Sequence, residues 1–181
     1  MSRHQPLRSL NLQAFADRGV PLNEQILLHN LERLAPEFIG LESDLIVILQ
    51  VRAELRPSAT GLQDTWLHLI ASTSIPLTCQ RCMAPVQTAL QVDQWYRFVD
   101  SEEVAMADDD ASIEDLLVMT PQFDLLSLLE DELLMALPLV PMHDHCPVAP
   151  VFSAGLADLL TDTVDKPNPF AALAQLKKSG N

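Results

Sequence analysis

The chain has 181 residues, enough for one ordinary domain, and 48% of them are hydrophobic, which excludes wholesale disorder. Its 25 acidic side chains against 11 basic ones give a net charge of −14. This charge argues against a broad basic surface for nucleic acid, but it permits a small basic site or a basic partner. Three cysteines make no disulfide framework, and neither a signal peptide nor an apolar run of about 18 residues is visible, so we expect a cytoplasmic protein.

The N-terminal part of the chain is expected to contain one short helix. Asn23 is a suitable N-cap, and Pro36 ends the segment. Between them, Leu27, Leu31 and Leu34 repeat at helical spacing.

The middle of the chain changes to period-two alternation, which is typical of strands. Apolar residues alternate with polar ones from Leu45 to Leu55, from Leu67 to Leu77 and from Val86 to Phe98. Three consecutive strands with short connections predict an antiparallel meander with one buried face. The acidic residues 100–115 are expected to form a solvated connector, and residues 113–119 can add a short edge strand.

The clearest helix begins after Asp124, a suitable N-cap, and its leucines repeat at helical spacing as far as Leu133. The acidic run at residues 130–132 is expected to be a solvated face of this helix. The pattern predicts an α+β fold, an antiparallel β meander of three or four strands covered by helices on one face. We expect an N-terminal segment, residues 1–40, to pack as one compact unit with an α+β domain at residues 41–178.

A short final helix is expected near the end of the chain. It begins at Asn168, with Pro169 at its first helical position and Phe170 on its apolar side. These three residues are a candidate docking element for a partner, and packing on the chain's own domain is the alternative.

A candidate metal site starts from Cys79 and Cys82, a C-x-x-C at the turn between the second and third strands. Two thiolates at this spacing can bind one tetrahedral zinc ion, and a complete site needs two more ligands. His143, His145 and Cys146 follow the long helix and can supply them. The alternative is a pair of reduced structural thiols beside a polar loop. Catalytic redox chemistry is disfavoured, because a strand follows the pair where thioredoxin-type sites have a helix.

A small basic patch is the candidate RNA-binding or partner-binding site of the strand region. It is drawn from the four arginines of the strand region, Arg52, Arg56, Arg81 and Arg97, some of which the meander can bring to one side. So few arginines on an acidic protein predict modest, salt-sensitive RNA affinity. Cross-strand pairing with Glu54 or Asp93 is the alternative role.

The exposed aromatic residues and the missing motifs bear on the class of protein. Trp66, Trp95 and Tyr96 are candidate exposed aromatics, and packing explains them better than base stacking because few basic residues accompany them. The sequence has no G-x-S-x-G, Walker-type or G-x-G-x-x-G motif, so no enzyme is expected. A zinc-dependent hydrolase would need an open coordination position and a nearby base, which nothing in the sequence supplies.

Three ordered segments carry a resemblance to a known family. They are Leu77-Thr78-Cys79-Gln80-Arg81-Cys82 with Pro85, then Phe123-Asp124-Leu125-Leu126 continuing through Leu129-Glu130-Asp131-Glu132 and Ala136-Leu137-Pro138-Leu139-Val140-Pro141 to His143-Asp144-His145-Cys146, and finally Lys166-Pro167-Asn168-Pro169-Phe170-Ala171. In this order, over roughly residues 40–178, they resemble the YceD family of bacterial large-subunit ribosomal RNA accumulation proteins.

The resemblance implies a role in accumulation or processing of 23S ribosomal RNA, with no established enzymatic activity and no catalytic residues. Some relatives have a longer cysteine-rich tail that looks like a zinc ribbon, whereas this chain has only Cys146 and two histidines in that region.

Two mechanisms stay open. In the first, the chain binds ribosomal RNA or a pre-ribosomal particle through the Cys79–Cys82 turn and nearby arginines. In the second, it is an acidic adaptor that binds a basic ribosomal protein or a processing nuclease without contacting RNA.

Overall fold

The structure, a computed structural model, describes residues 7–38, 44–58, 61 and 63–148. In chain order its elements are α1 (Leu12–Arg18), β1 (Leu22–Leu27), the 3-10 turns η1 (Leu28–Asn30) and η2 (Ala35–Glu37), β2 (Ile46–Pro57), β3 (Gln63–Thr78), β4 (Pro85–Val99), α2 (Glu102–Asp108), the 3-10 turn η3 (Asp109–Ala111), β5 (Asp115–Val118) and α3 (Leu125–Met135). None of these helices is long and apolar enough to cross a membrane. The final helix predicted from Asn168 lies outside the described residues, and so does part of the predicted domain at 41–178, whose bounds stay a prediction.

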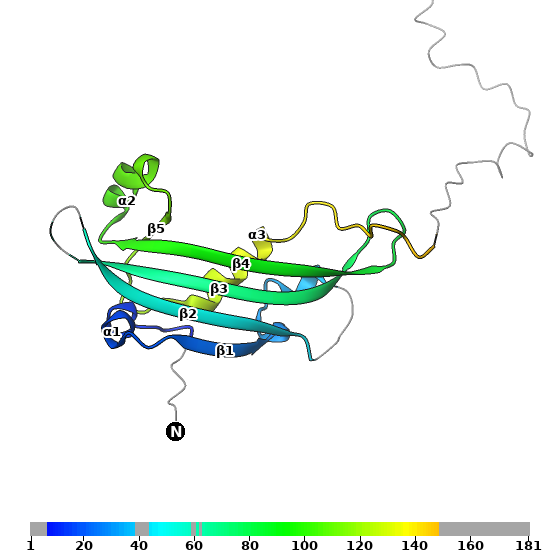
Figure 1. The fold of residues 1–181 in the computed structure, drawn as a ribbon, viewed down its shortest axis with the longest axis horizontal. Helices are drawn as coiled ribbons and strands as arrows, with labels where there is room; N and C mark the ends of the chain where they lie inside the picture. Colours follow the sequence, from blue (N-terminus) through cyan, green and yellow to red (C-terminus); the bar gives the residue numbers. More distant parts are fainter. Residues whose placement is uncertain (1–6, 39–43, 59–60, 62, 149–181) are drawn as a thin grey trace, which may run out of the picture. The chain divides into compact units, whose positions relative to one another are not determined.

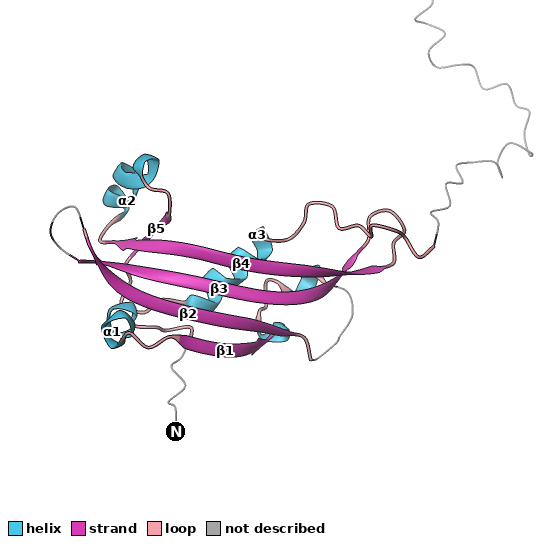
Figure 2. Cartoon of the chain, viewed as in Figure 1, coloured by secondary structure: helices cyan, strands magenta, loops and turns pink. Residues whose placement is uncertain are grey.

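The described part of the chain is an α+β fold built on one five-stranded sheet (Figures 1 and 2). The strand order is β1-β2-β3-β4-β5, and neighbours are antiparallel except β4 and β5, which are parallel. The predicted meander is confirmed as β2, β3 and β4. The sheet exceeds the three or four strands expected and is mixed, because β5 and β1 extend it at its two edges.

The helix predicted after Asn23 is wrong, because this segment forms β1. Asn23 lies opposite Gln50 and Ile26 opposite Val47, so the segment completes an edge of the sheet. Pairing with a neighbouring strand satisfies its backbone groups and buries Ile26, which outweighs a weak helical pattern. The helix of this region comes earlier, as α1, whose N-cap Asn11 accepts a hydrogen bond from the backbone N–H of Ala14 at 2.9 Å.

The acidic connector after β4 is more ordered than expected. Ser101 caps the short helix α2, and η3 follows directly. The expected edge strand at residues 113–119 is confirmed as β5, which pairs with the end of β4.

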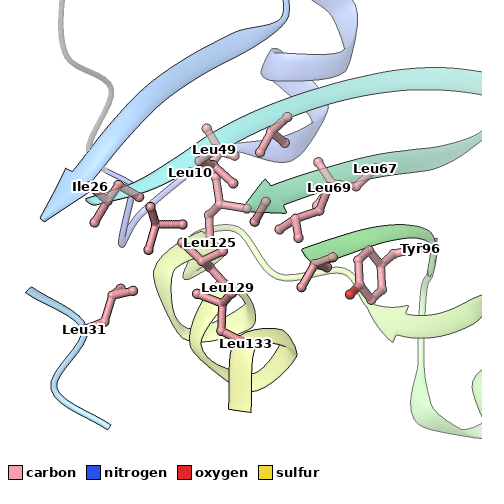
Figure 3. Packing of buried hydrophobic residues seen from close by; sticks show 14 of the residues in the cluster. Leu10, Ile26, Leu31, Leu49, Leu67, Leu69, Tyr96, Leu125, Leu129 and Leu133 are labelled. Carbon is pink, nitrogen blue, oxygen red and sulfur yellow. The ribbon is translucent and has the colours of Figure 1, made fainter. Parts of the chain in front are cut away.

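The hydrophobic core lies on the face of the sheet that carries the odd-numbered residues of β2 and β3. Leu49, Leu67 and Leu69 are fully buried there and belong to the same cluster as leucines of α3 (Figure 3). The N-terminal segment joins this core through Leu10, whose backbone N–H and C=O bond to Phe123 at 2.8 and 2.9 Å. Each leucine side chain buried in this way contributes roughly 1.5–3 kcal/mol of transfer free energy.

The acidic run of α3 is not a wholly solvated face, contrary to expectation. The side chains of Glu130 and Glu132 are only 3% and 7% exposed. Glu130 accepts a hydrogen bond from the backbone N–H of Arg33 at 2.9 Å, while Asp131 forms an ion pair with the Arg33 guanidinium. The carboxylates therefore fasten the 31–34 segment to α3, because a buried charge needs such partners.

Candidate metal centre

The C-x-x-C motif forms the tight turn between β3 and β4. The backbone C=O of Cys79 accepts from Met83 at 2.9 Å, and its N–H donates to Ala84 at 3.0 Å. Met83 has φ 62°, a left-handed conformation that is uncommon for a residue with a side chain. These contacts close the turn within six residues and return the chain directly into β4.

The segment that follows α3 is fastened to this turn. The backbone N–H of Gln80 donates to the C=O of Pro141 at 2.9 Å. The Arg81 guanidinium donates to the C=O of His143 at 2.6 Å and to that of Asp144 at 3.2 Å. Residues more than sixty positions apart in the sequence are thereby brought together.

Four side chains converge where the turn and the segment meet. They are Cys79, Cys82, His143 and Cys146, whose ligand atoms all lie within 4.8 Å of one another. The Sγ atoms of Cys79 and Cys146 are 3.9 Å apart, and Sγ of Cys82 is 3.5 Å from Nδ1 of His143. A tetrahedral zinc ion, with Zn–S about 2.3 Å and Zn–N about 2.0–2.1 Å, sets sulfurs about 3.8 Å apart and sulfur about 3.6 Å from nitrogen. The four side chains therefore have the spacing of one tetrahedral metal site.

The surrounding hydrogen bonds also suit a metal site. Nε2 of His143 lies 3.0 Å from the C=O of Pro85, which requires the imidazole proton on Nε2 and leaves the Nδ1 lone pair directed at the sulfurs. Nε of Arg81 donates to Sγ of Cys146 at 3.0 Å. Partners of this kind orient metal ligands and stabilise thiolate charge.

The thiols differ in their ionisation. Burial of Cys79 opposes the thiolate, but hydrogen bonds from the backbone of His143, Arg81 and Cys82 outweigh burial and lower the pKa of Cys79 to about 5. For Cys82, a backbone hydrogen bond from Ala84 favours the thiolate. Burial and the neighbouring sulfurs together outweigh it and raise the pKa of Cys82. A cation among these sulfurs would remove their mutual repulsion, as metal binding to thiolates does.

The sequence-predicted ligands are brought together with one exception. His145 is exposed and does not belong to the group, although it lies in the same segment as His143. The carbonyl of Pro85, which orients His143, was not identified from the sequence, because a backbone acceptor has no side-chain signature.

The predicted basic patch is divided among three places. Arg81 supports the candidate metal centre through Cys146. Arg97 is only 18% exposed and lies beside Asp64, Asp108 and Glu114. Arg52 and Arg56 lie over the ring of Trp95 on the open face of the sheet, where Arg52 is exposed. The predicted contact residues Asn168, Pro169 and Phe170 lie outside the described residues.

Comparisons with known proteins give one consistent result. Residues 67–177 match the family described as large ribosomal RNA subunit accumulation protein YceD, and this range contains the whole candidate metal centre. A relative from Haemophilus influenzae with that same name is 34% identical over 157 residues, which cover 83% of each chain. No solved structure matches the chain.

Proposed function

Because the chain belongs to the YceD family of large ribosomal RNA subunit accumulation proteins, we propose that it is a ribosome-biogenesis factor acting in the cytoplasm. It supports accumulation or processing of 23S ribosomal RNA, and it acts by binding and not by catalysis. The observation that carries this proposal is the extent of the family match, which spans most of β3, β4, α3 and the candidate metal centre.

The proposed cofactor is one structural Zn²⁺, bound by Cys79, Cys82, His143 and Cys146. Three thiolates and one imidazole are a typical structural zinc donor set. Four protein ligands leave no open position for a metal-bound water, which agrees with a role without catalysis. Such an ion would fasten the segment after α3 to the β3–β4 turn, where the hydrogen bond from Gln80 to Pro141 already joins them.

The proposed partner is the large-subunit ribosomal RNA, alone or in a pre-ribosomal particle, and the contact is direct. Support comes from an exposed arginine and neighbouring aromatic rings on the open face of the sheet. A specific observation favours the adaptor as a second candidate. The α2–η3 segment exposes four carboxylates and the side chain of Met106, a surface suited to a basic ribosomal protein or nuclease.

In-cell ultraviolet crosslinking of the tagged chain, with sequencing of RNA recovered under a denaturing wash, tests this proposal. We expect enrichment of a defined stretch of 23S RNA, and a lower ratio of 23S to 16S RNA in cells that lack the chain. Absence of crosslinks, with ribosomal proteins or a nuclease recovered under a native wash, would favour the adaptor. An unchanged 23S level in cells lacking the chain would contradict both candidates.

A further inference from the structure

The open face of the sheet carries a group of aromatic and basic side chains that the metal centre does not use. The register places Arg52 opposite His68 and His68 opposite Trp95, so one residue from each of β2, β3 and β4 forms a row. Trp66 lies two positions before His68 on β3, and Arg56 lies four positions after Arg52 on β2, both on the same face. We name these five residues the aromatic surface.

The rings of the aromatic surface lie in close contact. His68 and Trp95 are stacked, with ring centroids 4.3 Å apart and an interplanar angle of 2°. Trp66 meets Trp95 edge to face at 6.3 Å. The guanidinium carbon of Arg56 lies 4.2 Å from each indole centroid, and that of Arg52 lies 4.9 Å from the Trp95 centroid. Unpaired RNA bases stack on both kinds of group, aromatic rings and guanidinium planes.

A hollow of about 360 Å³ adjoins this surface where β1 meets β2. Arg52 and His68 belong to both the hollow and the aromatic surface, so the two are continuous. Asn23 and Gln50, which are register partners, bring exposed side-chain amides that both donate and accept hydrogen bonds. Ile70 supplies an apolar wall. A planar group with donors and acceptors at its edge fits this lining.

The charges of this surface favour RNA over a basic protein. Arg56 pairs with Glu54 at 2.5 Å, and Nε2 of His68 lies 2.6 Å from Asp93. Glu54 is therefore paired with a cation of the same surface, and Asp93 with an imidazole. Arg52 has no carboxylate partner among the described residues, so its charge is available to a phosphate.

We propose that the aromatic surface and the adjoining hollow form a binding site for single-stranded RNA, an inference that rests on the proposed function. One unpaired base enters the hollow and hydrogen-bonds to Asn23 and Gln50. A neighbouring base stacks on the outer side of the Arg56 guanidinium, which covers Trp66 and Trp95, and Arg52 contacts the phosphate between the two bases. Duplex RNA is excluded, because its base faces are buried in the helical stack.

This site reconciles RNA binding with a net charge of −14. Affinity comes from stacking and hydrogen bonds, with few phosphate contacts. One or two such contacts on a single strand predict a shallow slope of log affinity against log salt, about −0.7 to −1.4. A site built on a wide basic groove would give a much steeper slope.

Tryptophan fluorescence of the full chain tests the proposal directly, because both tryptophans of the chain lie in the aromatic surface. The probe is an unlabelled, unstructured single-stranded RNA decamer of mixed sequence. We expect saturable quenching with the shallow salt slope, and no quenching by a duplex of the same sequence. Arg52→Gln, and the double variant Asn23→Ala with Gln50→Ala, should each weaken binding about tenfold.

The variants alter exposed side chains, and the expected stability is that of the wild type in thermal unfolding. Arg18→Gln makes the same charge change as Arg52→Gln outside this surface, and its affinity should equal the wild type. Absence of quenching, or equal RNA affinity of wild type and Arg52→Gln, would overturn the inference.

In-cell crosslinking separates this inference from the proposed function. If 23S crosslinks persist undiminished in Arg52→Gln, the proposed function stands and the RNA is contacted elsewhere, which overturns the site. If Arg52→Gln lowers 23S RNA in cells while the purified wild-type chain binds no RNA, the surface binds a protein, and the inference again fails. Loss of crosslinks in Arg52→Gln together with weaker binding in solution would support it.

Discussion

The hairpin of β3 and β4 is held in two different ways at its two ends. Near the start of β3, Leu67 is buried and the ring of Phe98 meets Phe123 edge to face at 5.2 Å. At the opposite end, the turn is held by the hydrogen bond from Gln80 to Pro141 and by the four candidate ligands, while Met83 and Leu139 are exposed. Where this long hairpin extends beyond the apolar core, polar contacts and the proposed metal hold the chain in place.

The largest expected effect is at the apolar end. Leu129→Ala removes a fully buried side chain of α3 and should lower the free energy of unfolding by about 2–5 kcal/mol. Met135, in the same helix, is 70% exposed, and Met135→Ala should change it by less than about 0.5 kcal/mol. Urea denaturation measures both, and similar values for the two variants would contradict the assigned core.

Loss of one metal ligand should disturb the structure only near the β3–β4 turn. Cys146→Ser removes one of four ligands, so the zinc content should fall from about one to near zero ions per chain. The amide of Gln80 should then lose hydrogen-exchange protection, because its acceptor Pro141 is released, while amides of the sheet core keep theirs. Elemental analysis and hydrogen exchange measure these effects. His145→Ser is the matched control and should retain zinc, and loss of zinc in that control would contradict the assignment of His143.

Charge-matched variants of Arg81 and Arg52 should separate support of the metal site from RNA binding. Arg81→Gln removes the hydrogen bond to Sγ of Cys146 and should weaken zinc about 10–100-fold, as measured by chelator competition. Arg52→Gln should leave zinc affinity unchanged, since Arg52 contacts Trp95 and no ligand. Equal zinc affinity in all three proteins would show that the Arg81 contact does not support the site.

Alkaline pH should destabilise the apolar end of the β3–β4 hairpin, where Tyr96 is buried. Burial, assisted by the nearby Glu132, raises the pKa of Tyr96, so the folded state favours the neutral phenol. The corresponding stability is complete below the ordinary tyrosine pKa of about 10 and declines as pH rises above it. Tyr96 is the one tyrosine of the chain, so phenolate absorbance should appear together with unfolding monitored by circular dichroism. Phenolate formation in a chain that remains folded would contradict the burial of this residue.

The smallest expected effect concerns the turn itself. Met83→Gly removes a side chain from a left-handed position, which relieves roughly 1–2 kcal/mol of local strain. The greater flexibility of glycine in the unfolded chain offsets part of this, so the net gain should be under about 1 kcal/mol. Thermal unfolding with zinc present measures it, and a marked destabilisation would mean that the Met83 side chain packs on a partner.

Local patterns in the sequence were sufficient to predict the elements that bury one regular face. Alternation located β2, β3 and β4, and Asp124 was identified as the N-cap of α3, where it accepts from the N–H of Ser127 at 2.9 Å. The β1 strand was missed because only its pairing with β2 distinguishes it from a weak helix.

Long-range contacts account for the other differences. Glu130 was expected to be solvated, because its hydrogen-bond partner, the backbone of Arg33, is 97 positions away in the sequence. Spacing likewise proposed both His143 and His145 as ligands. The choice between them depends on which ring the Pro85 carbonyl orients toward the sulfurs.

The bridge between Leu10 and Phe123 also governs when the chain can fold during its own synthesis. The partner of Leu10 is made on the order of 110 residues later, which at about 5–20 residues per second is roughly 6 to 22 s. Until then α1 and Leu10 lack the α3 side of their core, and the N-terminal apolar residues remain open to other contacts. A factor proposed to serve the ribosome would thus complete the core of its own fold only after the segment around Phe123 has been synthesised.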